Sequence, residues 1–160
     1  MVPDYVSALR AAVGPDHLLW LPGVVAVVRD GHGQVLLQRR PADGWWTPLS
    51  GILEPGEDPA AAAVREVEEE TGVQVVVERL AMVTTSPPVR HGNGDRAQYL
   101  ELVFACRPAD PGQVPRVCDD ESVEVGWFAL DALPRMSARM REIIGVVVKD
   151  ESQAWFAPAP

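Results

Sequence analysis

The segment that most constrains the fold of this chain is GILEPGEDPAAAAVREVEEETGV, at residues 51–73. Proline is tolerated in the first turn of a helix, an acid there favours the helix dipole, and an alanine-rich run propagates helix well. Gly72 can end the helix, because glycine readily adopts the left-handed conformation that closes one. The sequence therefore predicts a helix over about 58–71. Its expected buried face consists of the small and apolar residues at helical spacing, Ala60, Ala63, Val64, Val67 and Thr71.

The same helix carries an acidic face. Glu66, Glu69 and Glu70 follow the spacing i, i+3, i+4, which places them within an arc of about 100°, while Glu68 points to solvent. Carboxylates this close repel one another unless a cation lies between them, and hard oxygen ligands suit Mg²⁺ or Mn²⁺. The charge pattern alone leaves a solvated acidic helix face as the alternative explanation.

Helix-like and strand-like stretches alternate along the rest of the chain, which predicts a mixed α/β class. With 160 residues, 47% of them hydrophobic, the chain can build one substantial core. We expect a single domain over 1–160 with its core at about 20–148, a short amphipathic helix at 3–13 and a loosely held C-terminal tail. Strands are expected at 23–30 and 34–40, paired as a hairpin, and at 73–85, 98–107 and 123–130, with a further helix within 131–150.

Charge and cysteine content narrow the class of protein. The formal net charge of −9 argues against binding to a nucleic-acid polymer. Two cysteines, Cys106 and Cys118, are too few for a disulfide framework, and both are expected as free thiols. The N-terminal stretch MVPDYVSALR lacks the features of a secretory signal, and no apolar run is long enough to span a bilayer. These features predict a soluble cytoplasmic protein with no membrane partner.

The spacing within 51–73 resembles the Nudix box, the signature of the Nudix hydrolase family, at every specified position. The matching residues are Gly51, Glu57, Arg65, Glu66, Val67, Glu69, Glu70, Gly72 and Val73. Flanking features extend the resemblance over most of 20–135, among them a Trp-x-x-Pro approach ending at Pro48 and the stretch EVGWFALDALP. Ser50 departs from the double glycine that family members often carry here; because serine is small, we expect the loop to survive.

The resemblance implies both a fold and an activity. Nudix proteins share an α/β/α sandwich around a mixed β-sheet, with the box forming a loop–helix–loop. They hydrolyse a nucleoside diphosphate linked to another moiety, X, by attack of water at phosphorus. In the family the helix glutamates hold one or more divalent cations, which implies Glu66, Glu69 and Glu70 as metal ligands here, with the Gly51 carbonyl as a further ligand. The expected cofactor is Mg²⁺, with Mn²⁺ as an alternative.

The reaction also needs a carboxylate that accepts a proton from the attacking water. The family uses no single fixed base, so a helix glutamate and a carboxylate on a distant loop both stay open. Glu121, six residues before Trp127, is the distant candidate that similar family members suggest; Glu124 competes with it, and an ordinary surface acid is the alternative. Arg65 is expected to orient the helix glutamates, and Glu57 to fix the loop through Arg65.

Candidate substrate-binding residues lie outside the box. Arg39 and Arg40 end a strand just before the box, and alternation lets one of them reach a phosphate while the other faces away. Trp45 and Trp46 offer a ring that could stack on a nucleobase, with at least one of the two in the core. We take Trp46 as the stacking candidate.

The stretch SPPVRHGNGDRAQY, at 86–99, is the candidate recognition loop, with an ordinary long hairpin loop as the alternative. Its candidate polar residues are Arg90, His91, Asn93 and Asp95. A family rule associates a proline about fifteen residues past the box with ADP-ribose hydrolysis, and Pro88 has this offset from Val73. The segment NGDRAQY also resembles ADP-ribose-type pyrophosphatases. The expected substrate is therefore ADP-ribose or another nucleoside diphosphate sugar.

Two other functions remain open from the sequence. One is hydrolysis of a nucleoside triphosphate or a CDP-alcohol with the same metal site. The other is a non-catalytic module that binds a nucleotide as a sensor, although such modules usually lose the box glutamates that this chain keeps. A homodimer is compatible with the resemblance, but no feature of the sequence requires it.

Overall fold

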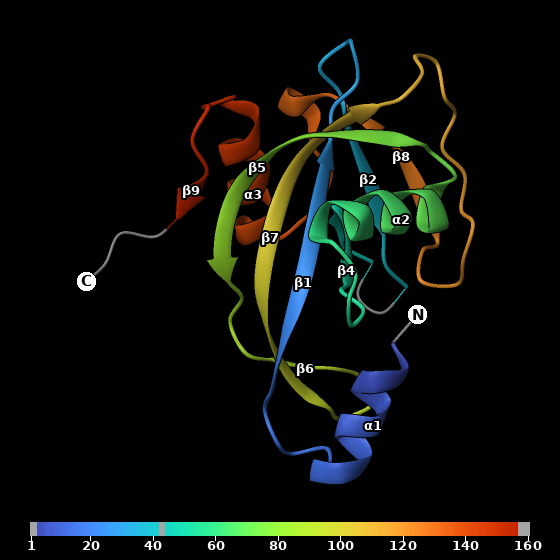
Figure 1. Ribbon diagram of the computed structural model, residues 1–160. Helices are drawn as coiled ribbons and strands as arrows, with labels where there is room; N and C mark the ends of the chain where they lie inside the picture. Colours follow the sequence, from blue (N-terminus) through green and yellow to red (C-terminus); the bar gives the residue numbers. More distant parts are fainter. Residues whose placement is uncertain (1–2, 42–43, 157–160) are drawn as a thin grey trace.

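The computed structural model describes residues 3–41 and 44–156, and Figure 1 traces them from blue to red. Within these residues a larger, six-stranded sheet contains β1 (Leu19–Val28), β4 (Leu49–Ile52), β5 (Val75–Thr85), β6 (Val89–Arg90), β7 (Arg96–Pro108) and β9 (Trp155–Phe156). A smaller sheet contains β2 (Val35–Arg39), β3 (Trp46–Thr47) and β8 (Glu124–Phe128). The helices are α1 (Asp4–Val13), α2 (Pro59–Thr71) and α3 (Ala138–Val148), with a 3-10 turn at Leu130–Ala132.

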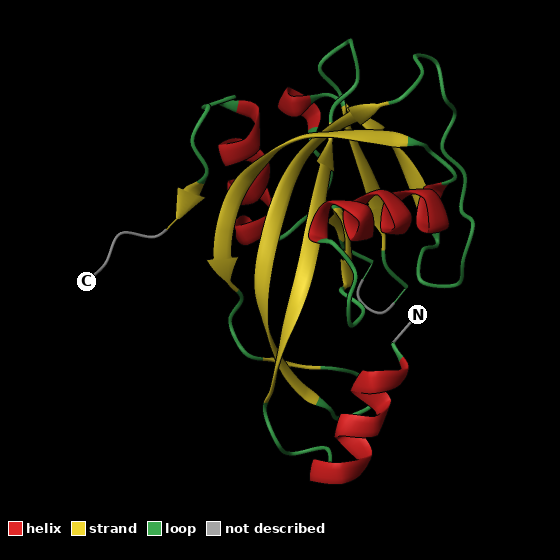
Figure 2. Cartoon of the chain, viewed as in Figure 1, coloured by secondary structure: helices red, strands yellow, loops and turns green. Residues whose placement is uncertain are grey.

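The larger sheet is mixed and lies between two helices. β1 runs parallel to β7 and antiparallel to β4, and the strand order is β4-β1-β7-β5-β9, with β6 paired to β7. Side chains of β1 alternate: Val24 and Ala26 pack in the core beneath α2, whereas Val25 and Val27 pack in the core that includes α3. Figure 2 shows α2 across one face of the sheet. This confirms the expected α/β/α arrangement around a mixed sheet.

The expected hairpin of 23–30 with 34–40 is wrong in its pairing, although the turn exists. Asp30 accepts hydrogen bonds from the amides of His32 and Gln34, and one antiparallel bridge joins Arg29 to Val35. Beyond it the strands separate: β1 lies between β4 and β7, and β2 between β3 and β8. Residues 23–28 of β1 and 35–38 of β2 are continuous buried runs, so each is a central strand that needs a neighbour on either side.

The expected helix at 58–71 is confirmed as α2, which ends at Gly72 in the left-handed conformation, with φ 69°. Its orientation differs from the expectation, because Ala60 is exposed. The buried face consists of Ala62, Ala63, Glu66, Val67, Glu70 and Thr71. The helix is therefore turned so that two of its glutamates face the protein interior.

The remaining elements lie close to the expected ranges. The expected N-terminal helix is α1, at the end of the molecule beside β6 in Figure 1, and β7 begins slightly earlier than expected, at Arg96. In the tail, Trp155 and Phe156 form β9 and pair with Met82 and Val83 of β5; 157–160 lie outside the described residues. No helix among the described residues is long and apolar enough to cross a membrane.

Candidate active site

Gly51 allows the carboxylate of Glu66 to lie directly against β4. Gly51 pairs with Val24 of β1, and a Cβ placed on Gly51 would overlap the Glu66 carboxylate. Any other residue at 51 would displace that carboxylate or the strand. The sequence suggested close approach of this backbone to a metal, which stays a prediction; what the structure shows is close approach of an acid.

Arg65 holds three carboxylates at the rim of α2. Its guanidinium is bidentate to Glu57, with Nε to Oε1 at 2.8 Å and Nη2 to Oε2 at 3.0 Å. Its Nη1 donates to Glu66 Oε1 at 2.8 Å and to Glu69 Oε2 at 3.1 Å. The hydrogen bonds from Arg65 lower the pKa of Glu57, which also accepts from the amide of Glu54. These contacts fit the orienting role suggested for Arg65 and the loop-fixing role suggested for Glu57, and both roles stay predictions.

Glu70 is the most deeply buried acid of the helix, with 2% exposure. Its Oε2 accepts from Gln38 Nε2 at 2.8 Å, whereas its Oε1 is buried with no hydrogen-bond partner among the described residues. Burial raises the pKa of Glu70 to about 8, against the opposing effect of the Gln38 hydrogen bond. Ser122 in turn donates to Gln38 Oε1. Gln38 was absent from the candidate residues; its position directly after the apolar run VLL was the available signal.

The three helix glutamates therefore occupy different environments. Glu66 is 8% exposed, and its burial raises its pKa while Arg65 opposes the rise. The Glu69 side chain is 57% exposed and faces Arg65. Across 3–41 and 44–156, no three acidic, histidine or cysteine side chains converge into a ready-made metal cluster. The donor set still suits a hard divalent cation, because it consists of carboxylate and carbonyl oxygens and includes the unpartnered Glu70 Oε1.

A cavity of about 680 Å³ reaches the acidic helix at Glu66. At one end it is lined by Gly51 and Glu66, with Glu121 on its wall. At the other end it is lined by α1 and by the loop that connects β5 to β7. The competing acid Glu124 does not line it and instead pairs with Arg39 at 3.0 Å. Of the two acids, Glu121 is therefore the one that lines the cavity, and its role as the distant carboxylate stays a prediction.

The two neighbouring arginines face in different directions, as strand alternation suggested. Arg40 lines the cavity, and its Nη2 donates to Ser50 Oγ at 2.9 Å. Arg39 makes its ion pair with Glu124 on the surface, so of the two arginines Arg40 is the one that lines the cavity, and its contact with a phosphate stays a prediction. The serine that replaces the usual glycine thus anchors this side chain.

The two tryptophans also differ. Trp46 is buried and packs edge-on against Phe128, with ring centroids 4.6 Å apart, while part of it lines the cavity. Trp45 is half-buried, lines the cavity and lies under the guanidinium of Arg135, 5.0 Å from the ring centroid. Trp46 is thus chiefly a core residue, and its stacking role stays a prediction; Trp45 presents more of its surface.

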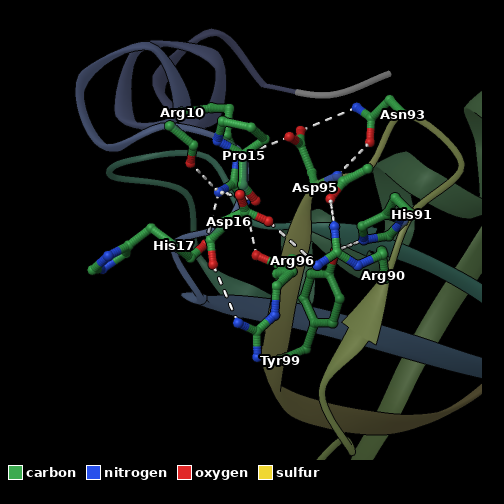
Figure 3. A network of polar contacts seen from close by, with 12 residues as sticks. Arg10, Pro15, Asp16, His17, Arg90, His91, Asn93, Asp95, Arg96 and Tyr99 are labelled. Atoms are coloured by element: carbon green, nitrogen blue, oxygen red, sulfur yellow. Dashed lines mark hydrogen bonds and ion pairs between the residues drawn. The ribbon is translucent and has the colours of Figure 1, made fainter.

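The candidate recognition loop, whose polar side chains are drawn in Figure 3, contributes unevenly to the cavity. His91, Asn93 and Asp95 line it, and His91 Nε2 lies 2.8 Å from Tyr99 Oη. Arg90 does not line it; its guanidinium bonds to the carbonyl of Gly94 and faces Asp16. Three of the four candidate residues of the loop therefore line the cavity, whereas Arg90 faces Asp16, and a role of the loop in recognition stays a prediction.

Three charged cavity residues were absent from the sequence-based candidates. Arg139 of α3 donates to Glu101 of β7, and both line the cavity. Arg10 of α1 lines it as well. These residues come from segments far apart in the chain, so no local sequence pattern could have indicated that they meet at the cavity.

Comparison with known proteins identifies the family. The NUDIX domain matches residues 19–147. A MutT-like protein of Streptomyces ambofaciens is 35% identical over 147 residues, which cover 91% of this chain and 84% of that protein. The NAD-capped RNA hydrolase NudC of Chromobacterium violaceum is 36% identical over 115 residues, which cover 71% of this chain but 39% of that protein.

Among solved structures, a UDP-X diphosphatase superposes with a TM-score of 0.65 at 25% identity, covering 96% of this chain and 73% of that one. The residues matched by the family run from the start of β1 almost to the end of α3, and they include the whole acidic helix. The chain therefore belongs to the Nudix family and is a pyrophosphohydrolase, an enzyme that cleaves phosphorus-containing acid anhydrides.

Proposed function

We propose that this enzyme hydrolyses the phosphoanhydride bond of ADP-ribose or a related nucleoside diphosphate sugar with the help of Mg²⁺. The observation that carries the proposal is the cavity of about 680 Å³, which extends from Glu66 and Gly51 to the loop containing His91 and Asn93. Pockets of about 300–1,000 Å³ hold ligands of this size. A substrate with its diphosphate at the acidic helix would have room for a nucleoside and a sugar on either side.

Charged and polar groups along the cavity suit such a substrate. Arg40 offers a fixed cation for a phosphate, because its bond to Ser50 restrains the guanidinium. The paired side chains of Glu101 and Arg139 offer an acceptor and donors to sugar hydroxyls. The name of the structural relative, UDP-X diphosphatase, describes a substrate of the same general form.

A divalent cation would be held by Glu66, Glu69 and Glu70 together with the Gly51 carbonyl. Once bound, it would neutralise phosphate oxygens and lower the pKa of a bound water. Glu70 must lose its proton to act as a ligand, because burial keeps its pKa near neutrality. Glu121 is the proposed acceptor of a proton from the attacking water, a role that its position on the cavity wall supports.

A substrate panel tests the proposal. ADP-ribose, other nucleoside diphosphate sugars, nucleoside triphosphates and CDP-alcohols are incubated with the full chain and Mg²⁺, and nucleoside monophosphate and phosphate release are measured. Mass analysis after reaction in heavy-oxygen water locates the attacked phosphorus. Preference for a diphosphate sugar supports the proposal; preference for a triphosphate or CDP-alcohol replaces it. Inertness toward every compound with both Mg²⁺ and Mn²⁺ would favour the nucleotide-sensing alternative.

A further inference from the structure

Helix α1 precedes the residues matched by the family, yet it forms part of the cavity wall. Val6 and Arg10 line the cavity, although the family match begins at residue 19. The helix is held by apolar packing, since Val6 is buried in one cluster with Leu19, Leu21 and Ala97. α1 is thus a packed part of the molecule in direct contact with the space proposed for the substrate.

One guanidinium joins α1 to the recognition loop (Figure 3). Arg10 Nη1 donates to the carbonyls of Gly14 at 2.8 Å, Pro15 at 3.2 Å and His17 at 2.7 Å. Its Nη2 donates to the carbonyl of Arg96, the first residue of β7, at 2.8 Å. These four bonds use the planar fork of arginine, which an ammonium group cannot reproduce.

Arg10 also forms an ion pair with the loop itself. Its Nε lies 3.3 Å from Asp95 Oδ1, and the Arg10 side chain is 14% exposed. Asp95 belongs to a tight turn: its amide donates to Asn93 Oδ1 at 3.0 Å, and its carbonyl accepts from the His91 amide at 2.8 Å. Asn93 Nδ2 donates back to Asp95 Oδ2 at 3.0 Å. The pair therefore fixes a turn whose His91 and Asn93 line the cavity.

A second set of contacts ties the same segments together more loosely. Arg96 donates from its amide to the Pro15 carbonyl at 3.2 Å and from its side chain to the Asp16 carbonyl at 3.3 Å. Arg90 faces Asp16 at 3.4 Å, but both side chains are largely exposed. Exposed pairs of this kind contribute little, so the more buried Arg10 is the main restraint on the turn.

We propose that Arg10 is a positioning residue that holds the 91–95 turn in place to recognise the part of the substrate farthest from the diphosphate. This inference rests on the proposed function, because it concerns the same cavity. A contact that is made equally in the ground and transition states binds the substrate uniformly, so its loss raises KM and leaves kcat nearly unchanged. The contacts of the 91–95 turn are proposed to be of this kind. α1 would then be a specificity element added to the family core.

Kinetics of Arg10→Met on the full chain test the proposal. With the best diphosphate-sugar substrate we expect KM to rise about tenfold and kcat to stay within about twofold. Arg79→Met is the matched control: that side chain is 18% exposed, lies near Asp150, and bonds to the Val147 carbonyl, but it does not line the cavity. Arg10→Lys keeps the charge beside Asp95 without the fork, so it should restore only part of the affinity.

Two truncated substrates show which moiety the turn recognises. The methyl ester of ADP lacks the sugar X, and ribose diphosphate esters lack the nucleobase. The truncated compound that lacks the recognised moiety should show no Arg10→Met effect, while the other keeps it. An unchanged KM for the intact substrate, or an equal loss with both truncated compounds, would overturn the proposal.

Hydrogen exchange of the ligand-free protein separates this inference from the proposed function. The backbone amides of 91–96 should exchange faster in Arg10→Met than in wild type, whereas their exchange rates should be unchanged in Arg79→Met. If the wild-type enzyme cleaves no diphosphate sugar, the proposed function fails and the exchange result alone decides whether Arg10 positions the turn. Unchanged exchange overturns that positioning role, whatever the substrate.

Discussion

The two ends of the cavity are built in different ways. At the acidic end, Gly51, Arg65 and the helix glutamates come from one contiguous stretch, and short-range contacts hold them. At the recognition end, Arg10 of α1 reaches Asp95, more than 80 positions away in the chain, and Arg96, for which the separation is 86. A single motif can thus specify chemistry, while recognition depends on how distant segments pack. Changes at the acidic end should abolish turnover, and changes at the recognition end should alter affinity.

The largest effect is expected from Glu70→Gln at the acidic end. The amide keeps the shape of the side chain but removes the charge that a cation needs, so kcat should fall by about a thousandfold or more. The fold should persist, because a neutral amide avoids the cost of burying a charge at this site. Glu68→Gln is the control, since Glu68 is exposed on the same helix and contacts Gln74. Circular dichroism and steady-state kinetics provide the measurements, and near-normal turnover in Glu70→Gln would contradict the metal role.

Gly51→Ala should have the next largest effect. The new methyl would overlap the Glu66 carboxylate, so that side chain or β4 must move. Overpacking of this kind costs about 1–3 kcal/mol of unfolding free energy, and misplacement of Glu66 should reduce kcat by about a hundredfold. Gly31→Ala is the matched control, because a Cβ there meets open space. Thermal unfolding and kinetics check both effects; a fully active Gly51→Ala would show that the position of Glu66 is not critical.

The same contrast explains what the sequence could and could not predict. The helix at 58–71 and its end at Gly72 follow from local propensity, and the existence of the strands follows from their apolar runs. These elements lie close to the ranges that the sequence predicts. The hairpin was wrong because pairing partners are chosen by burial on both faces of β1 and β2, which a turn signal does not report. Arg10 and the pair of Glu101 with Arg139 were missed because each contact exists only after distant segments have packed.

Arg40→Met should produce a moderate effect, between those of the two ends. Arg40 lines the cavity and is restrained by Ser50, so loss of its cation should raise KM by about tenfold with a smaller change in kcat. Arg39→Met is a sharp control, since the adjacent arginine is directed to Glu124 on the surface. The KM and kcat of Arg39→Met should stay within about twofold of the wild-type values. Equal effects of the two variants would contradict the assignment of Arg40 to the phosphate.

The smallest expected effect is a pH dependence of stability that originates at the acidic end. In the metal-free protein, burial raises the pKa of Glu70 from 4.5 to about 8, so the folded state binds a proton more tightly than the unfolded state. That contribution to stability is complete below about pH 4.5 and is lost as the pH rises through about 8. Burial also raises the pKa of Glu66, which acts in the same direction, whereas the lowered pKa of Glu57 acts mainly at more acidic pH.

Unfolding curves measured in chelator between pH 5 and 9 should therefore show Tm falling as the pH rises, and Glu70→Gln should flatten much of this slope. Mg²⁺ should oppose the fall, because it binds the ionised carboxylate and so stabilises more strongly at higher pH. The recognition-end variant Arg10→Met should keep the wild-type slope, even where its absolute Tm is lower. If Tm still falls with pH in Glu70→Gln, or no longer falls in Arg10→Met, the titrating group lies outside the acidic end. The pH dependence would then no longer distinguish the acidic end of the cavity from the recognition end.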